Sequence, residues 1–197
     1  MSSTMQYSEN CWSDILIGDR IVLKRMYPTP QNAQLLCKNI CENRDHLSDS
    51  FKFLVHKITS VSSALTYLQA HQKECELGYR DSYGIFVKDD FVGMICVWGD
   101  RHKKRELLYW LKSEACGHGF MKEALNLVEC EQAKCAPNKA LLAIVKETAV
   151  ASKALLNECG YSSDETCFWK IPAKPITTRI VVKSAQLGQH TQGHSYG

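Results

Sequence analysis

The stretch "YWLKSEACGHGFMKEAL" (residues 109–125) decides the fold, because it reads as the end of a strand, a loop with two glycines and the start of a helix. Gly117 and Gly119 flank a single residue, His118, so backbone N–H groups can converge there without a Cβ in the way. The helix that follows adds unpaired N–H donors and the positive end of its dipole. This combination suits an anion such as phosphate, and an ordinary turn into a helix is the alternative.

Upstream of this loop, the apolar residues follow first a strand period and then a helix period. Residues 19–26 alternate and contain β-branched side chains, which predicts a first strand. Thr29 is a predicted N-cap with Pro30 at the first helical position, and the apolar residues up to position 41 share one helix face. Residues 43–54 show no clear period, so we expect an irregular segment there.

A second helix and a hairpin are predicted between this irregular segment and the glycine loop. Thr59 or Ser60 can cap the helix, and Gly78 stops it. Residues 82–98 form two apolar runs joined by a tight turn at Asp89-Asp90, which predicts a β-hairpin. The strand of residues 106–111 then leads into the loop.

Downstream of the loop, the chain predicts a helix, a buried strand, a short helix closed by Gly160, and two last strands that include residues 176–184. The predicted order is β-α-α-β-β-β-α-β-α-β-β, a mixed α/β (α+β) sheet in one domain. We expect a polar leader at residues 1–14, the domain at 15–184 and a flexible tail at 185–197. A chain of 197 residues with 45% apolar residues is long enough for one good core.

Charge and hydropathy limit the classes of binding partner that we expect for this protein. The net charge of +3 gives no argument for nucleic acid. The basic loop at residues 101–105 is read as solvated, with RNA or an acidic protein surface as the alternative. No apolar run approaches 18 residues and no signal-peptide pattern opens the chain, so we expect a cytoplasmic protein with no membrane partner.

The ten cysteines lack the pattern of a disulfide framework or a zinc site. Disulfides suit small secreted domains, and no paired Cys-x2-Cys clusters are present. Cys37 and Cys41 lie among the apolar residues of the first helix, where they can act as small buried hydrophobes. We therefore expect reduced, mostly buried thiols and no metal.

Three segments in this order resemble the GNAT family of acetyl-CoA-dependent N-acetyltransferases. The sequence "ELLYWLKSEACGHGFMKEAL" is similar to the family's strand, glycine loop and helix, and "ASKALLNECGY" to its later Asn-x-Ala-Ser segment. "NRDHL" is typical of the branch named for the RimJ and RimL acetyltransferases. The resemblance covers nearly the whole chain, from about residue 15 to residue 184.

The resemblance implies a site for acetyl-CoA as co-substrate. The loop N–H groups would hold the pyrophosphate, and the pantetheine arm would pair with the strand backbone near Trp110 and Leu111. The residues implied in cofactor binding are Trp110, Leu111, Cys116, Gly117, His118, Gly119, Phe120 and Met121. His118 is either a donor to phosphate or a solvated loop histidine.

The resemblance also implies direct transfer of acetyl to a primary amine, first of all a protein N-terminal amine. Glu106 would take the amine's proton through water, and Ser152 would return a proton to the leaving thiolate. A solvated strand-end carboxylate and a helix-start serine are the respective alternatives. Two departures from the family pattern are Cys116, in place of arginine or glutamine, and Ala149, in place of asparagine. A polyamine or small-molecule acetyltransferase and an inactive coenzyme-A-binding domain therefore stay open, as does a homodimer.

Overall fold

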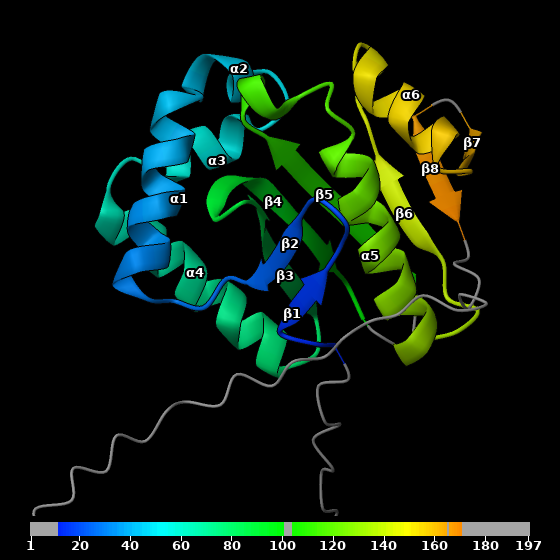
Figure 1. Cartoon of the computed structure of the whole chain (residues 1–197), viewed down its shortest axis with the longest axis horizontal. Coiled ribbons are helices and arrows are strands. Elements are labelled where there is room, and N and C mark those ends of the chain that lie inside the picture. The colour runs from blue at the N-terminus through cyan, green and yellow to red at the C-terminus, as the bar shows by residue number, and fades with distance from the viewer. Residues whose placement is uncertain (1–11, 101–103, 165, 171–197) are drawn as a thin grey trace, which may run out of the picture.

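The computed structural model describes residues 12–100, 104–164 and 166–170, and these form a single sheet with helices on both faces (Figure 1). The eight strands stand in the order β1-β2-β3-β4-β5-β6-β8-β7, and every neighbouring pair is antiparallel except β5 and β6. Their bounds are β1 Ile15–Ile17, β2 Val22–Arg25, β3 Arg80–Val87, β4 Asp90–Trp98, β5 Arg105–Leu111, β6 Leu141–Ile144, β7 Ser162–Asp164 and β8 Cys167–Lys170.

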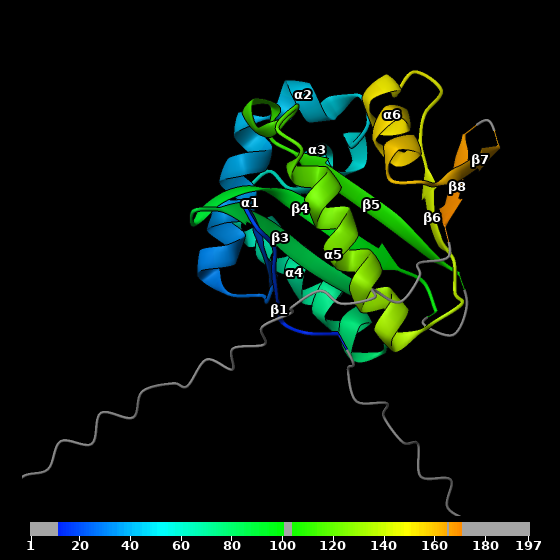
Figure 2. The same cartoon turned by 45° about the vertical axis from the view of Figure 1, so that its right-hand side comes forward.

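Two groups of helices cover the two faces of this sheet (Figures 1 and 2). On one face, α1 (Pro30–Glu42), α2 (Arg44–Ser48), α3 (Lys52–Lys57) and α4 (Val61–Glu76) bury their apolar residues in one core cluster. On the other face, α5 (Phe120–Cys135) and α6 (Val150–Glu158) pack into a second cluster. Because strand side chains alternate between faces, the central strands β3, β4 and β5 contribute side chains to both clusters. Leu107 of β5 lies in the second cluster, for example, and Trp110 in the first.

The pairing between β5 and β6 is short, and this decides where a site can form. Only Arg105 with Leu141 and Glu106 with Leu142 are paired in this parallel ladder. Beyond Glu106, β5 continues along β4 as far as Leu111 and leaves β6 behind. The two strands therefore diverge, and backbone groups of β5 that face β6 lose their ladder partner.

The predicted helix boundaries are confirmed. Thr29 accepts a hydrogen bond from the N–H of Asn32 and Pro30 opens α1, while Ser60 caps α4 through a reciprocal pair with Ser63. Gly78 follows the end of α4 with φ of +78°, the left-handed conformation that glycine tolerates best. These boundaries depend on contacts within four residues, which is why the sequence predicts them.

Three local predictions differ from the structure. The predicted strand at residues 19–26 is present as β2, but it pairs with an unpredicted strand, β1, because the Gly18 N–H bonds the Ile21 carbonyl (2.9 Å) and turns the chain back. The irregular segment is two short helices, α2 and α3, whose Leu47 and Leu54 are buried against α1 and α4. The hairpin turn falls at Lys88-Asp89, where both residues have positive φ, one position before the predicted site.

Several other expectations fall on residues with no description here. The strand at 176–184, the tail at 185–197 and most of the basic loop at 101–105 lie outside the described residues. Trp12, in the segment predicted to be a polar leader, is buried and stacks on Tyr83 with ring centroids 6.3 Å apart. Within the described ranges, no helix combines the length and apolar character that a membrane crossing requires.

The cysteines differ in part from the expectation of reduced and mostly buried thiols. Eight form no disulfide in the described part of the chain, and of these only Cys75, Cys96 and Cys159 are buried. Cys41 is exposed and Cys37 is half-buried, because both lie at the edge of the α1 face rather than in its centre. Cys135 is disulfide-bonded, so the prediction of reduced thiols is wrong for that residue.

Candidate active site

A cavity of about 660 Å³ opens where β5 and β6 diverge. One wall comes from α5, α6 and the glycine loop, and the opposite wall comes from α2 and from Ser50 and Phe51, which lie between α2 and α3. The two walls belong to helices that cover opposite faces of the sheet, so the cavity reaches through the gap between the strands. Such a cavity can admit one ligand from each face.

The glycine loop forms the anion-binding end of this cavity. Gly117 and Gly119 have φ of +77° and +78°, and Gly119 is the N-cap of α5. The first backbone bond of the helix runs from the Glu123 N–H to the Gly119 carbonyl (3.2 Å), so the N–H groups of residues 120–122 come before it. Helix-start donors of this kind favour a phosphate group. A Cβ on Gly117 would meet no atom within 4 Å, which leaves the loop open on that side.

Arg20 fixes the shape of the loop from outside the cavity. Its guanidinium contacts the Glu123 carboxylate (3.0 Å) and donates to the His118 carbonyl (2.8 Å). The His118 ring lies 2.8 Å from the Cys116 carbonyl and stacks on Phe120. His118 is thereby held on the outside of the loop and does not line the cavity.

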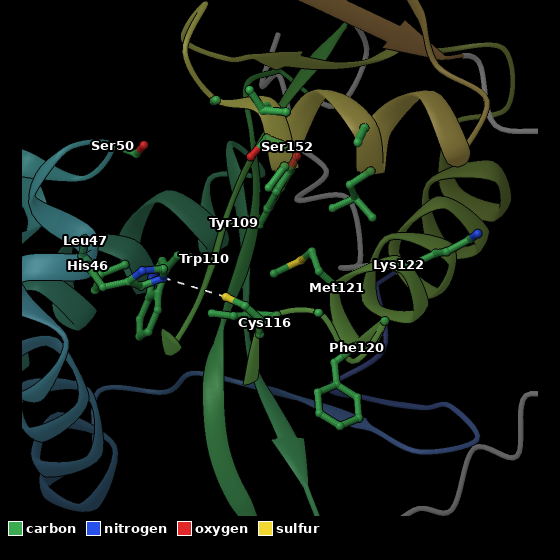
Figure 3. Close-up of a pocket in the computed structure, with 18 of the residues that line it drawn as sticks. His46, Leu47, Ser50, Tyr109, Trp110, Cys116, Phe120, Met121, Lys122 and Ser152 are labelled. Atoms are coloured by element: carbon green, nitrogen blue, oxygen red, sulfur yellow. Dashed lines mark hydrogen bonds between the residues drawn. The ribbon is translucent and has the colours of Figure 1, made fainter. Parts of the chain in front are cut away.

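The segment "NRDHL" is held against the glycine loop from the other face. The Asn43 side chain accepts a hydrogen bond from the Ser113 N–H (3.0 Å), which ties the start of α2 to the segment that precedes the loop. One turn further, the His46 ring lies 3.9 Å from the Cys116 thiol (Figure 3). The thiol also donates to the Lys112 carbonyl, and burial raises the pKa of Cys116. A thiol in that state is a poor nucleophile at neutral pH.

The structure brings most of the predicted site residues together. Besides Ser152, the cavity is lined by seven of the predicted cofactor-binding residues: Trp110, Leu111, Cys116, Gly117, Gly119, Phe120 and Met121. Ala149, the second departure from the family pattern, lines it as well. Close packing between β4 and β5 positions the strand wall, because a Cβ on Gly93 would collide with the Trp110 carbonyl.

Glu106 is placed differently from the other predicted residues. It stands at the last paired position of β5, three residues before the cavity wall begins at Tyr109, and it does not line the cavity. Its side chain is half-buried, and this burial raises the pKa of its carboxyl group.

Tyr109 and Ser152 meet at the top of the cavity. Figure 3 shows the Tyr109 ring extending from β5 toward Ser152 in the first turn of α6. Burial raises the pKa of the Tyr109 phenol to about 12, the Ser152 hydroxyl opposes this shift, and Cys159 adds to it. The pair brings two hydroxyl groups to the wall of a half-apolar cavity.

Sequence reasoning missed several residues of this site. Tyr109 was part of the matched strand but received no role, and Lys122, whose Nζ lies 3.3 Å from the Glu158 carboxylate, was not considered. On the opposite wall, His46, Ser50 and Phe51 line the cavity from a segment expected to be irregular. The similarity of "NRDHL" to the RimJ and RimL branch was the one available signal for that wall.

The described residues contain no group of three or more His, Cys, Asp or Glu side chains arranged to hold a metal ion. The groups that line the site are backbone N–H donors, hydroxyl groups and the aromatic and aliphatic side chains around them.

Sequence comparison assigns the family. Residues 20–162 match the profile described as "Acetyltransferase (GNAT) domain", and the chain therefore belongs to the GNAT acetyltransferases. A search of curated protein sequences finds no match.

Solved structures share this fold at low sequence identity. RimL, described as a ribosomal L7/L12 alpha-N-protein acetyltransferase in complex with coenzyme A, superposes with a TM-score of 0.72 at 16% identity over 80% of this chain and 97% of its own. RimJ of Mycobacterium smegmatis, in complex with CoA-disulfide, superposes with a TM-score of 0.69 at 15% identity, over 81% of this chain and 86% of its own. The microcin C7 self immunity acetyltransferase MccE, in complex with acetyl-CoA and AMP, superposes with a TM-score of 0.70 at 18% identity, over 78% of this chain and 93% of its own. The predicted resemblance to the RimJ and RimL branch is confirmed at the level of the fold.

Proposed function

We propose that the protein transfers acetyl from acetyl-CoA to a primary amine, and in the first instance to a protein N-terminal amine. The observation that carries the proposal is one cavity where β5 and β6 diverge, with helix-start donors at one end and a separate wall from α2 and residues 50–51 on the other face. Thioester and amine can then approach each other from opposite faces of the sheet. The fold of RimL and RimJ, whose RimL member is described as acetylating a ribosomal protein N-terminus, supports this choice of acceptor.

The cofactor end of the cavity would bind acetyl-CoA mainly through backbone groups. The N–H groups of the loop from Gly117 and of the first turn of α5 can hold the pyrophosphate, and Lys122 at the rim adds a positive charge. The free edge of β5 near Trp110 and Leu111 can pair with the amides of the pantetheine arm, as an added strand would. Neither interaction needs the side chain at position 116, so Cys116 is compatible with binding.

Acyl transfer would then proceed directly between the two ligands. The amine must be neutral to attack the carbonyl carbon, and Glu106 would accept its proton through a bridging water. Burial raises the pKa of Glu106, which brings this base closer to neutral pH. Once the C–S bond breaks, Ser152 at the cavity wall would return a proton to the thiolate.

Two measurements test this proposal. Acetyl-CoA binds only the folded chain in this scheme, so it should raise the melting temperature by mass action. The release of free thiol is then followed with acetyl-CoA and a panel of peptides with free or blocked N-termini, polyamines and aminoglycosides. Thiol release that requires a free peptide N-terminus supports the proposal.

The alternatives give different results in the same assay. Release with polyamines but not with peptides would identify a small-molecule acetyltransferase. A melting shift without any thiol release would identify an inactive coenzyme-A-binding domain, the alternative raised by Cys116 and Ala149. The absence of a melting shift at millimolar acetyl-CoA would overturn all three readings.

A further inference from the structure

Two hydroxyl groups, not one, stand where the proposed reaction needs a proton donor. Tyr109 and Ser152 both line the cavity, one from β5 and the other from α6. The Tyr109 hydroxyl is shielded from solvent, and it makes no hydrogen bond of ordinary geometry within the part of the chain that the structure describes. Burying a hydroxyl without a partner costs free energy, so its position asks for an explanation.

We infer that Tyr109 is the proton source behind Ser152, and that the two hydroxyls form a relay to the leaving thiolate. This inference rests on the proposed acetyltransferase function and adds a residue to it. Ser152 is half-exposed at the cavity wall and can touch the sulfur, whereas the Tyr109 hydroxyl is shielded from solvent and its ring extends toward Ser152. Tyr109 is therefore a positioning and relay residue, and Ser152 is the group that meets the substrate.

The acidity of the two groups favours this order. An aliphatic alcohol is a much weaker acid than a phenol, so Ser152 acting alone would have to become an alkoxide to protonate a thiolate. If Tyr109 gives its proton to the Ser152 oxygen, the negative charge is carried by the Tyr109 phenol oxygen and not by a serine alkoxide. Burial raises the pKa of Tyr109 to about 12, so the phenol keeps its proton throughout the neutral range and is always ready to donate.

The relay balances as a single step. The amine nitrogen forms a bond to the thioester carbon and gives up a proton through water to Glu106, while the C–S bond breaks and its electron pair leaves on sulfur. The Ser152 proton moves to sulfur while the Tyr109 proton moves to the Ser152 oxygen. After coenzyme A leaves, Glu106 releases its proton to solvent and the Tyr109 phenolate takes one up, so amine and thioester yield amide and thiol with the enzyme unchanged.

The first test removes one oxygen atom. Tyr109→Phe keeps the ring and its packing, so the acetyl-CoA melting shift and KM should stay close to those of the parent. Its kcat should fall by about 10²-fold, the lower end of the range for general acid–base catalysis. Tyr161→Phe is the matched control, because the Tyr161 hydroxyl is also buried in the same core but its residue does not line the cavity. This control should turn over like the parent.

Two further readouts separate a relay from a packing role. If Tyr109 and Ser152 act in series, Tyr109→Phe combined with Ser152→Ala should be no slower than the slower single variant. Replacing Tyr109 with a fluorinated tyrosine of lower phenol pKa should move the alkaline limb of the pH profile of kcat to lower pH, by as much as the free phenol shifts. A structural tyrosine would leave that limb in place.

The outcomes also separate this inference from the function on which it rests. Turnover by Tyr109→Phe within threefold of an active parent, or additive losses in the double variant, would overturn the relay and leave the acetyltransferase function standing. An unchanged alkaline limb with fluorotyrosine would do the same. A parent that binds acetyl-CoA but releases no thiol with any amine would overturn both.

Discussion

Individual side chains decide how the glycine loop meets its ligand, and position 116 is the most informative of them. The Cys116 thiol faces His46 and the Lys112 carbonyl, on the side of the loop where α2 lies. The loop N–H groups do not depend on it. Losing the polar side chain that relatives carry here therefore removes one contact and leaves the backbone donors intact.

Cys116→Arg should tighten acetyl-CoA binding by up to about tenfold, or about 1.4 kcal/mol, because it restores one charged donor near the phosphates. Isothermal titration calorimetry measures this directly. Cys41→Arg, at an exposed thiol on α1, is the control and should bind like the parent. Weaker binding by Cys116→Arg would mean that the loop has been rebuilt around the thiol.

A buried histidine makes stability depend on pH. His71 lies on α4 beside the Tyr67 ring, with its Nδ1 atom 3.2 Å from the Ser82 hydroxyl. Burial, together with the positive charges of Arg80 and Lys57, lowers the pKa of His71 to about 3. Because the unfolded chain takes up the proton near pH 6.5, the folded state is favoured fully above that pH and loses stability between pH 6.5 and pH 3.

The free energy of unfolding should therefore fall by up to about 1.4 kcal/mol for each pH unit below 6.5. Urea denaturation at pH 7, 6 and 5 measures the slope. His71→Asn keeps a partner for Ser82 and should flatten the slope, whereas His56→Asn at an exposed position should not. Equal slopes for His71→Asn and the parent would assign the pH dependence to other groups.

At the scale of elements, the helix that lies across β3 shows how local capping and packing combine. In α4, Ser60 accepts from the Ser63 N–H (3.1 Å), and the Ser63 hydroxyl lies 3.0 Å from the Ser60 nitrogen. The same helix buries Ala64, Tyr67 and Leu68 against the sheet. The cap determines where the helix begins, and the packed face determines how it lies on the sheet.

Ser60→Ala should reduce the free energy of unfolding by about 1 kcal/mol, since it removes the acceptor for a helix-start donor. Chemical denaturation measures this loss. Ser62→Ala, two residues away on the same exposed turn, makes no side-chain cap and should cost nothing. A loss of the same size in both variants would refute a role for the cap.

At the scale of the whole molecule, a buried charge network joins strands that are far apart in the sequence. The Asp81 carboxylate on β3 forms ion pairs with Arg25 of β2 (3.0 Å) and with Arg105 of β5 (2.9 Å). The side chains of Asp81 and Arg105 are fully buried. The Arg105 guanidinium also lies over the Trp12 ring, which brings the N-terminal segment onto the sheet. Asp81 thus pairs with two arginines, and Asp14 pairs with Arg25 as well (2.9 Å), at the end of β5 opposite the cavity.

Asp81→Asn should destabilise the fold by about 3–5 kcal/mol, because it removes the buried carboxylate that pairs with both Arg25 and Arg105. Asp89→Asn, whose ion pair with Lys24 is exposed, should leave the unfolding free energy unchanged within error. Urea denaturation compares the two. A small effect of Asp81→Asn would show that water or other groups compensate the arginines.

The sequence by itself determined the features that depend on a few neighbouring residues. Gly117 and Gly119 require a backbone with positive φ, and Thr29, Ser60 and Gly78 mark helix boundaries through hydrogen bonds or turns that close within four residues. The order of strands and helices follows from the spacing of apolar residues, and the family resemblance follows from three sequence segments in the right order. Errors arose at the β1-β2 hairpin and at α2 and α3, where segments too short to show a period are shaped by the core they cover.

Only the tertiary structure decided which side chains share the site. Cys116 and His46 are seventy positions apart in sequence, and their contact depends on how α2 docks on the loop. The end of the β5-β6 ladder at Glu106 leaves this carboxyl group outside the cavity wall, while the same divergence places Tyr109 beside Ser152. Local propensity carries no information about such distances, because they result from the packing of two helical layers on a sheet whose strands part between them.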